Sequence, residues 1–282
     1  MNEIQIVECP RDAMQGLKYF ISTENKVKYI NSLIDVGFDI IDFGSFVSPK
    51  YVPQMKDTEQ VLNNIKLNNH TSLLSIVVNK KGAEKAIKFP KIKYLGYPLS
   101  ISETFQIKNS NKSIDQSIIL IEELQNMCEN SGQELIVYIS MAFGNIYNDK
   151  YSISILLRYI EKLINLGIKK ITLADTIAIA NENIIANVFK ELKKINNVSF
   201  GLHLHSDPKD AIGKIKTAWE NGCRSFDSTI RGYGGCPFAK NELVGNVSTE
   251  TLINFIQSRK LKNRINFLAY ETAYNNSMDI FK

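Results

Sequence analysis

Two of the three histidines of the chain stand two residues apart, in the apolar run from Gly201 to His205. Residues i and i+2 of a β-strand point to the same face. His203 and His205 would therefore project their imidazoles in one direction, as ligands of a shared metal ion must. The pair indicates a divalent-metal site, and the alternative is a strand face that ends in two polar residues.

Two further residues could complete such a site. Asp12 and Asn246 could add oxygen ligands to the two imidazole nitrogens. A mixed oxygen and nitrogen set with bound waters suits Mg2+ or Mn2+, and two imidazoles favour Mn2+. A structural zinc would more often enlist cysteine, and no cysteine lies at ligand spacing in the sequence.

Cys236 stands in the glycine-rich run from Arg231 to Ala239. Glycines on both sides of a thiol are typical of a mobile loop with exposed backbone. We therefore expect a reachable thiol that takes part in chemistry, and the alternative is an inert surface cysteine.

The elements that must position these residues alternate along the whole chain. Apolar, strand-like runs fall at 4–7, 39–43, 72–78, 94–101, 134–142, 170–174, 199–205 and 225–230. Helix-like stretches fall at 24–36, 58–66, 82–89, 115–130, 153–166, 181–193, 208–221 and 249–258. Eight strands, each followed by a helix, predict a single (β/α)8 TIM barrel. No G-x-G-x-x-G follows the first strand, which disfavours a doubly wound open sheet.

We therefore expect one catalytic domain over 1–282, with the barrel at about 4–258 and a short helical or partly mobile tail at about 259–282. In such a barrel the active site lies at the carboxyl ends of the strands. Polar residues that follow several predicted strands would meet there: Arg11, Asp12, Gln15, Asp42, Asp175 and Thr176. An arginine beside a carboxylate is also a common structural salt bridge, so Arg11 alone does not establish a site.

Composition limits the other classes of function. The net charge is +5 and lysines are spread along the sequence, which favours a solvated surface over nucleic-acid binding. The four cysteines form no C-x-x-C pair, and no signal peptide or apolar span of about 18 residues is evident. We expect free thiols, a cytoplasmic location, no membrane partner and, on base rates, a homodimer.

Several motifs carry a resemblance to a known family. The run from Val7 to Gln15 resembles the opening motif of the metal-dependent barrel lyases and synthases. Three narrower runs, 45–55, 102–105 and 234–239, resemble 3-hydroxy-3-methylglutaryl-coenzyme A (HMG-CoA) lyase. The resemblance covers roughly residues 4–258, and the S-F-V-S-P-K and G-G-C-P runs are specific to the lyase branch.

This resemblance implies a retro-Claisen lyase that cleaves HMG-CoA to acetyl-CoA and acetoacetate. Asp12, His203, His205 and Asn246 would bind one Mg2+ or Mn2+. Arg11 would stabilise the enolate, Cys236 would lie on a mobile loop over the reacting carbon, and Gln15, Asp175 and Thr176 would contact the substrate. Cys236, His203 and Asp42 all stay open as the acid or base.

Two departures from the family pattern bear on specificity. Asp42 stands where the lyases usually carry Glu, and the run from Gly144 to Asn148 replaces a G-C-P-Y-E motif. These departures leave the acyl-group specificity open, so a related lyase with a different 3-hydroxyacyl-CoA substrate is one alternative. A second is a Claisen-type acyltransferase that joins acetyl-CoA to a 2-oxo acid. A third is a non-catalytic acyl-CoA- or metal-binding module, against which the intact residue set argues: Arg11, Asp12, His203, His205, Cys236 and Asn246.

Overall fold

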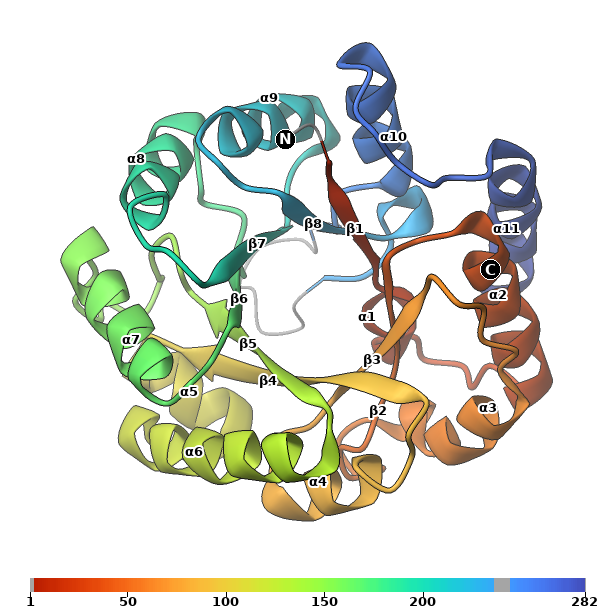
Figure 1. The fold of residues 1–282 in the computed structure, drawn as a ribbon, viewed down its shortest axis with the longest axis horizontal. Helices are drawn as coiled ribbons and strands as arrows, with labels where there is room; N and C mark the ends of the chain where they lie inside the picture. The colour runs from red at the N-terminus through yellow and green to blue at the C-terminus, as the bar shows by residue number, and fades with distance from the viewer. Residues whose placement is uncertain (1–2, 236–243, 282) are drawn as a thin grey trace.

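A computed structural model describes residues 3–235 and 244–281. Over these ranges, eight parallel strands close into one barrel in the order of the sequence, and helices surround it (Figure 1), as predicted. The strands are β1 (Gln5–Glu8), β2 (Ile40–Ser45), β3 (Ser72–Ile76), β4 (Ile92–Ser100), β5 (Glu134–Ser140), β6 (Lys170–Asp175), β7 (Ser199–Leu204) and β8 (Ser225–Ser228). Each predicted strand overlaps an observed one, because strands buried on both faces read as continuous apolar runs.

The helices are α1 (Pro10–Gln15), α2 (Thr23–Val36), α3 (Thr58–Asn64), α4 (Lys80–Ala86), α5 (Glu103–Ser110), α6 (Ile114–Ser131), α7 (Ile153–Asn165), α8 (Glu182–Leu192), α9 (Pro208–Glu220), α10 (Thr249–Ser258) and α11 (Phe267–Ile280), with 3-10 turns η1 (Pro53–Met55) and η2 (Ile230–Gly232). Helices α1 and α5 were not predicted from the sequence. Both are short and start at strand ends that were expected to lead into loops. No helix in the described ranges is long and apolar enough to cross a membrane.

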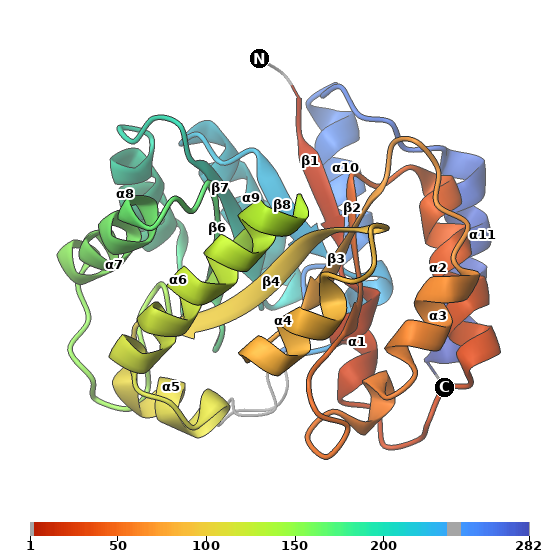
Figure 2. The same cartoon turned by 60° about the horizontal axis from the view of Figure 1, so that its bottom comes forward.

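The tail forms a helix that belongs to the body of the protein. Helix α11 packs along α2 on the outside of the barrel (Figure 2). Phe281 meets the ring of Tyr29 edge-on at 6.1 Å, and Tyr19 donates a hydrogen bond of 2.6 Å to the carbonyl oxygen of Ile280. Of the two expectations for the tail, a helix or a partly mobile end, the structure shows the helix.

The barrel interior is lined by its own small apolar cluster. Its buried side chains come from alternate positions of neighbouring strands: Val7, Cys9, Ile40, Leu74, Tyr94 and Ile136. The strand β1 pairs with β8 so that Val7 lies opposite Asp227. This closure brings the first and last strands together beneath the carboxyl-end face, where the candidate site lies.

Candidate active site

Residues from the two ends of the barrel sequence converge at the carboxyl ends of its strands. Arg11 and Asp12 lie on α1, which begins directly after β1 with Pro10 at its first turn. His203 is on β7, and His205 forms an isolated bridge with Asn246. Proline suits the first helical turn because its missing N–H has no partner there. The tight turn after β1 thus places Arg11 and Asp12 beside the histidine strand.

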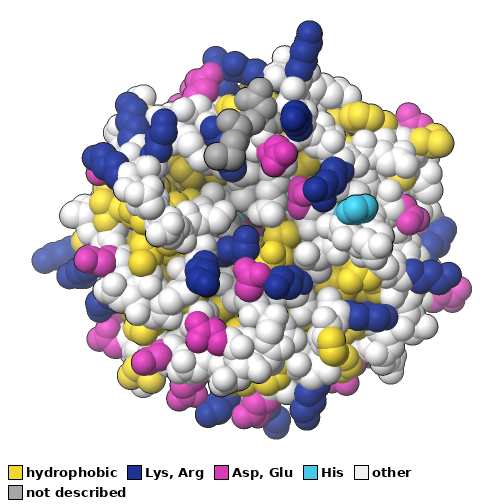
Figure 3. Space-filling view, in the orientation of Figure 1, with side chains coloured by type: hydrophobic (Ala, Val, Ile, Leu, Met, Phe, Trp, Pro, Cys, Tyr) yellow, Lys and Arg dark blue, Asp and Glu magenta, His cyan; other side chains and the backbone are white. Residues whose placement is uncertain are grey.

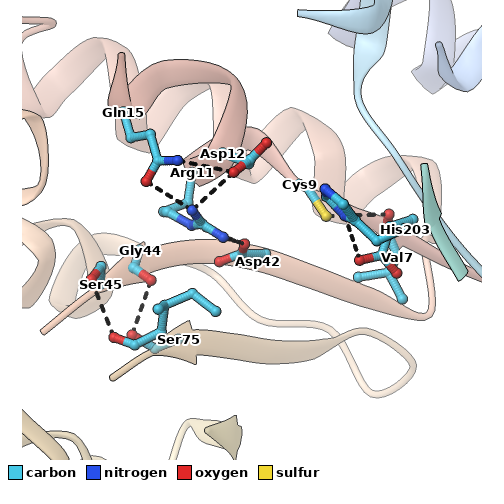
Figure 4. Close-up of polar contacts among 12 residues, drawn as sticks. Val7, Cys9, Arg11, Asp12, Gln15, Asp42, Gly44, Ser45, Ser75 and His203 are labelled. Atoms are coloured by element: carbon cyan, nitrogen blue, oxygen red, sulfur yellow. Dashed lines mark hydrogen bonds and ion pairs between the residues drawn. The ribbon is translucent and has the colours of Figure 1, made fainter. Parts of the chain in front are cut away.

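The guanidinium of Arg11 is held on three sides (Figure 4). Its Nε and Nη2 donate to Asp42 Oδ2 at 2.9 and 2.6 Å, and its Nη1 donates to Asp12 at 3.0 Å and to Gln15 at 2.9 Å. Burial opposes the charge of Arg11, but Asp42 and Asp12 outweigh it, so its pKa is raised. The structure therefore fixes a planar cation at the barrel mouth.

Asp42 is buried, and Arg11 donates hydrogen bonds to only one of its two carboxylate oxygens. Burial raises the pKa of Asp42 to about 6, and the guanidinium of Arg11 limits the rise. Asp42 Oδ1 has no hydrogen-bond partner among the described residues. A carboxyl group with a pKa near neutrality and a free oxygen can exchange a proton with a neighbouring group.

His203 and His205 point toward the same region, as the strand periodicity predicts. Their ring centroids are 5.1 Å apart and the rings are nearly perpendicular. His203 Nδ1 lies 3.0 Å from Asp227 Oδ2, an arrangement that orients a ligating histidine through a carboxylate. Burial lowers the pKa of His203, but Asp227 outweighs it and the net shift is upward. Burial and then His203 lower the pKa of His205 to about 4, which keeps that imidazole neutral and able to act as a ligand.

Asp12 and Asn246 are in direct contact. Asn246 Nδ2 donates to Asp12 Oδ2 at 2.7 Å and to the carbonyl oxygen of Tyr233 at 2.9 Å. Gly234 packs against this pair with φ of +95°, and a Cβ there would lie 2.7 Å from Asn246 Nδ2. Glycine is therefore required for the chain after β8 to lie against Asp12 and Asn246.

The donor types present suit a divalent cation, but in the described structure Asp12, His203 and His205 do not lie within 4.8 Å of one another as one donor group. Asp12, His203, His205 and Asn246 offer carboxylate, imidazole and amide donors, a set that Mg2+ and Mn2+ accept. Burial raises the pKa of Asp12, but Arg11, His203 and His205 outweigh it, so Asp12 stays ionised. His205 Nδ1 and Asp42 Oδ1 are buried without a partner in the described ranges. Unpaired buried polar atoms are costly, and a cation with its waters would satisfy such atoms.

The three residues expected to contact substrate have different surroundings. Gln15 lies at the barrel mouth, where its Nε2 donates to Asp12 Oδ1 at 3.0 Å. Asp175 accepts hydrogen bonds from the backbone of Ile179 and Ala180, so its carboxylate shapes the loop after β6. Thr176 accepts from the backbone of Met141 at 2.9 Å. Their contact with substrate stays a prediction.

One group of possible metal ligands was not predicted from the sequence. Within the described residues, one group of three or more His, Cys, Asp and Glu donors lies close enough to hold a metal ion, and it is Cys9, His203 and Asp227. No cysteine lies at ligand spacing in the sequence, and this group was missed because spacing along the chain relates only sequence neighbours. Strand alternation was the available signal, because Cys9 continues the alternation of Val7 just past β1, Asp227 lies opposite Val7 on β8, and His203 lies on β7, the next strand.

The three cysteines within the described residues form no disulfide with one another, as expected from the sequence. Cys9, Cys128 and Cys223 are free and buried. Cys236 lies outside the described residues.

Comparisons with known proteins agree with this geometry. The HMGL-like family model matches residues 3–275. The hydroxymethylglutaryl-CoA lyase YngG of Bacillus subtilis is 30% identical over 91% of this chain and 85% of its own length. The mitochondrial hydroxymethylglutaryl-CoA lyase of Bos taurus is 30% identical over 94% of this chain and 81% of its own length.

Solved structures give the same result. The HMG-CoA lyase of Bacillus subtilis superposes with a TM-score of 0.91 at 29% identity, over 98% of this chain and 92% of the other. An HMG-CoA lyase of Acinetobacter baumannii, solved with coenzyme A and 3-methylmalate, also has a TM-score of 0.91, at 28% identity over 99% of this chain and 91% of the other. With its opening motif, histidine pair and closed barrel in these positions, the chain belongs to the HMGL-like family.

Proposed function

We propose that this protein is a divalent-metal-dependent carbon–carbon lyase that cleaves HMG-CoA to acetyl-CoA and acetoacetate. The observation that carries the proposal is the convergence of a fixed cation, Arg11, with the donors Asp12, His203, His205 and Asn246 at the carboxyl-end face of the barrel. A relative that binds coenzyme A with a small dicarboxylate supports an acyl-CoA substrate.

The metal would be held by Asp12, His203, His205 and Asn246, and a bound Mg2+ or Mn2+ would lower the pKa of the substrate's C3 hydroxyl and fix its orientation. Asn246 would have to offer its amide oxygen, whereas its nitrogen now faces Asp12. Asp227 holds the ring of His203 by the Nδ1 contact and leaves Nε2 for the site.

Arg11 would stabilise the negative charge that develops on the thioester oxygen when the C2–C3 bond breaks. A guanidinium is always charged at physiological pH, and Asp42 and Gln15 hold its plane in advance. In many enzymes, charge stabilisation by groups that need no reorganisation accounts for most of the rate enhancement. Arg11 therefore serves as the enolate partner, and its contacts to carboxylates position it.

A proton must leave the C3 hydroxyl and another must reach the enolate carbon. Asp42, with a pKa of about 6, His203 and Cys236 are the groups that this chain offers for these transfers. Asp42 bonds directly to Arg11, so its protonation state also changes the charge around the proposed enolate position.

The deciding experiment incubates the protein with Mg2+ and HMG-CoA and measures acetoacetate. Acetoacetate formation supports the lyase. Activity only with a different 3-hydroxyacyl-CoA would assign the acyl specificity to the altered run 144–148, and activity only with acetyl-CoA plus a 2-oxo acid would assign a Claisen-type acyltransferase. Homodimer formation and a cytoplasmic location stay predictions, which size-exclusion chromatography with light scattering and cell fractionation would test.

A further inference from the structure

Cys9 stands beside the proposed site, and the lyase reaction gives it no role. In the described parts of the chain, its Sγ, a ring nitrogen of His203 and a carboxylate oxygen of Asp227 lie within 4.8 Å of one another. Figure 4 shows the thiol of Cys9 next to the ring of His203. Sulfur, nitrogen and oxygen donors from three strands or strand ends thus converge on one point inside the barrel.

Two observations point to a cation at this place. Asp227 is buried, and its Oδ1 makes no hydrogen bond of normal length among the described residues, with the hydroxyl of Tyr138 close enough to act on the pKa of this carboxyl. The thiol of Cys9 is also buried, with one long contact of 3.7 Å to the carbonyl oxygen of Val7. An unpaired carboxylate oxygen next to a weakly bonded thiol leaves two ligand atoms available.

The backbone holds the three residues in place. The ladder between β1 and β8 sets Val7 opposite Asp227, and the amide of Cys9 donates to the carbonyl oxygen of Ser228 at 2.9 Å. His203 follows on β7, the other neighbour of β8. The donors are therefore fixed by the barrel itself, and a small ion needs only modest side-chain adjustment.

We propose that Cys9, His203 and Asp227 bind a thiophilic divalent cation such as Zn2+ or Cd2+. Three protein ligands of the Cys, His and carboxylate types with one open position form a familiar zinc environment. Mg2+ and Mn2+ prefer oxygen, so the sulfur of Cys9 selects against them. On binding, the S–H bond of Cys9 breaks, its proton passes to solvent, and the sulfur lone pair forms the bond to the metal without any change of oxidation state.

Occupation of this site inhibits the function proposed above. Asp227 orients His203 through Nδ1, and an ion that takes the same carboxylate and the same ring disturbs that orientation. The soft-metal site and the catalytic arrangement therefore compete for His203. The side chain of His203 is 13% exposed, so its ring is not sealed from solvent.

The test is a titration of the full chain with Cd2+ in the absence of substrate, followed by the ultraviolet absorption of the cadmium–thiolate bond. We compare the parent with Cys9→Ser, which keeps the size of the side chain. Matched controls are Cys223→Ser, at a second buried thiol that donates to Ser225, and Cys236→Ser. The parent and both controls should develop the absorption band, and Cys9→Ser should lose it.

A band that persists in Cys9→Ser, or that disappears in Cys236→Ser, overturns the proposal. Cys9→Ala, with a melting curve for each variant, separates a lost ligand from a lost fold. If the lyase activity is present, the Zn2+ concentration for half-inhibition should rise about tenfold or more in Cys9→Ser. The cadmium titration needs no turnover, so failure of the proposed function and failure of this site give different results.

Discussion

The side-chain amide of Asn246 donates a hydrogen bond of 2.7 Å to Asp12 Oδ2, across 234 positions of sequence. This contact joins the first strand–helix turn to the segment that follows the last strand. It also leaves the amide nitrogen, and not the oxygen, facing Asp12. The candidate site therefore depends on the two ends of the barrel sequence meeting correctly.

Removal of one imidazole should weaken metal binding. His205→Ala should lower the affinity for Mn2+, and excess Mn2+ should restore part of the activity, because one neutral nitrogen ligand is lost. Calorimetric titration with Mn2+ measures the effect. The matched control is His70→Ala, at the exposed third histidine. Unchanged affinity in His205→Ala would show that the histidine pair is not a ligand pair.

Replacement of the planar cation should reduce turnover. A lysine at position 11 has one nitrogen and cannot reproduce the separate bonds from Arg11 to Asp42, Asp12 and Gln15. We expect Arg11→Lys to lower kcat by about 10²-fold or more with near-normal metal affinity. Arg259→Lys, at an exposed arginine paired with Glu220, is the control. Normal kcat together with a lowered melting temperature would make Arg11 structural.

Thiol reactivity should be confined to one cysteine in the native protein. Cys9, Cys128 and Cys223 are buried, so an alkylating reagent should reach them slowly. From the sequence we expect Cys236 to be modified early, with loss of activity, and a bound substrate analogue to slow the reaction. Mass spectrometry of the labelled peptides measures the order. Cys236→Ser should turn over slowly, and near-parental activity in that variant would remove the sulfur from the chemistry.

The free energy of unfolding should depend on pH through the ionisation of Glu8, which lies outside the candidate site. Glu8 is fully buried and accepts bonds from Ile230 N and Thr249 Oγ1, and burial raises its pKa to about 8 from an ordinary 4.5. Between these values the folded protein keeps a proton that the unfolded chain has released. The free energy of unfolding should therefore fall as pH rises from about 4.5 to 8, by about 1.4 kcal/mol per unit of pKa shift at most.

Glu8→Gln removes this titration; its amide oxygen can accept from Ile230 N, and its amide NH2 takes the place of the protonated carboxyl oxygen facing Thr249 Oγ1. It should unfold at higher urea than the parent at pH 8.5 and at nearly the same urea at pH 5. Glu122→Gln, at an exposed position of α6, should show no such difference. If the free energies of unfolding of the parent and of Glu8→Gln change with pH in the same way over this range, Glu8 does not keep a proton in the folded protein.

The sequence predicted the barrel well because its strands are continuous buried runs, as in β2, where all six residues are buried. Strand periodicity also predicted the convergence of His203 and His205. The short helix α1 was missed because its polar residues, Arg11, Asp12 and Gln15, resemble a loop. No local pattern distinguishes six helical residues from a turn when their side chains bond to one another.

Contacts between distant strands could not be found from local spacing. The pairing of β1 with β2 places Asp42 against Arg11, and the closure of β1 on β8 places Cys9 near Asp227. The helix α11 was expected only as a helical or partly mobile tail, because its apolar residues are mixed with exposed ones, Leu268 and Met278 among them, and no strand follows to confirm the pattern. The register between strands determines which residues of neighbouring strands lie opposite one another, and this register is a property of the folded sheet.

The pairing of β1 with β8, and of α2 with α11, also constrains when the protein can fold during synthesis. The first strand emerges from the ribosome early but finds its second neighbour only when residues 225–228 appear. The apolar face of α2 then waits for residues 267–280. Contacts of such long sequence separation form late, so most of the nascent chain must stay soluble with an open barrel edge. Truncated translation products that end before α11 should therefore be the ones that chaperones and proteases engage.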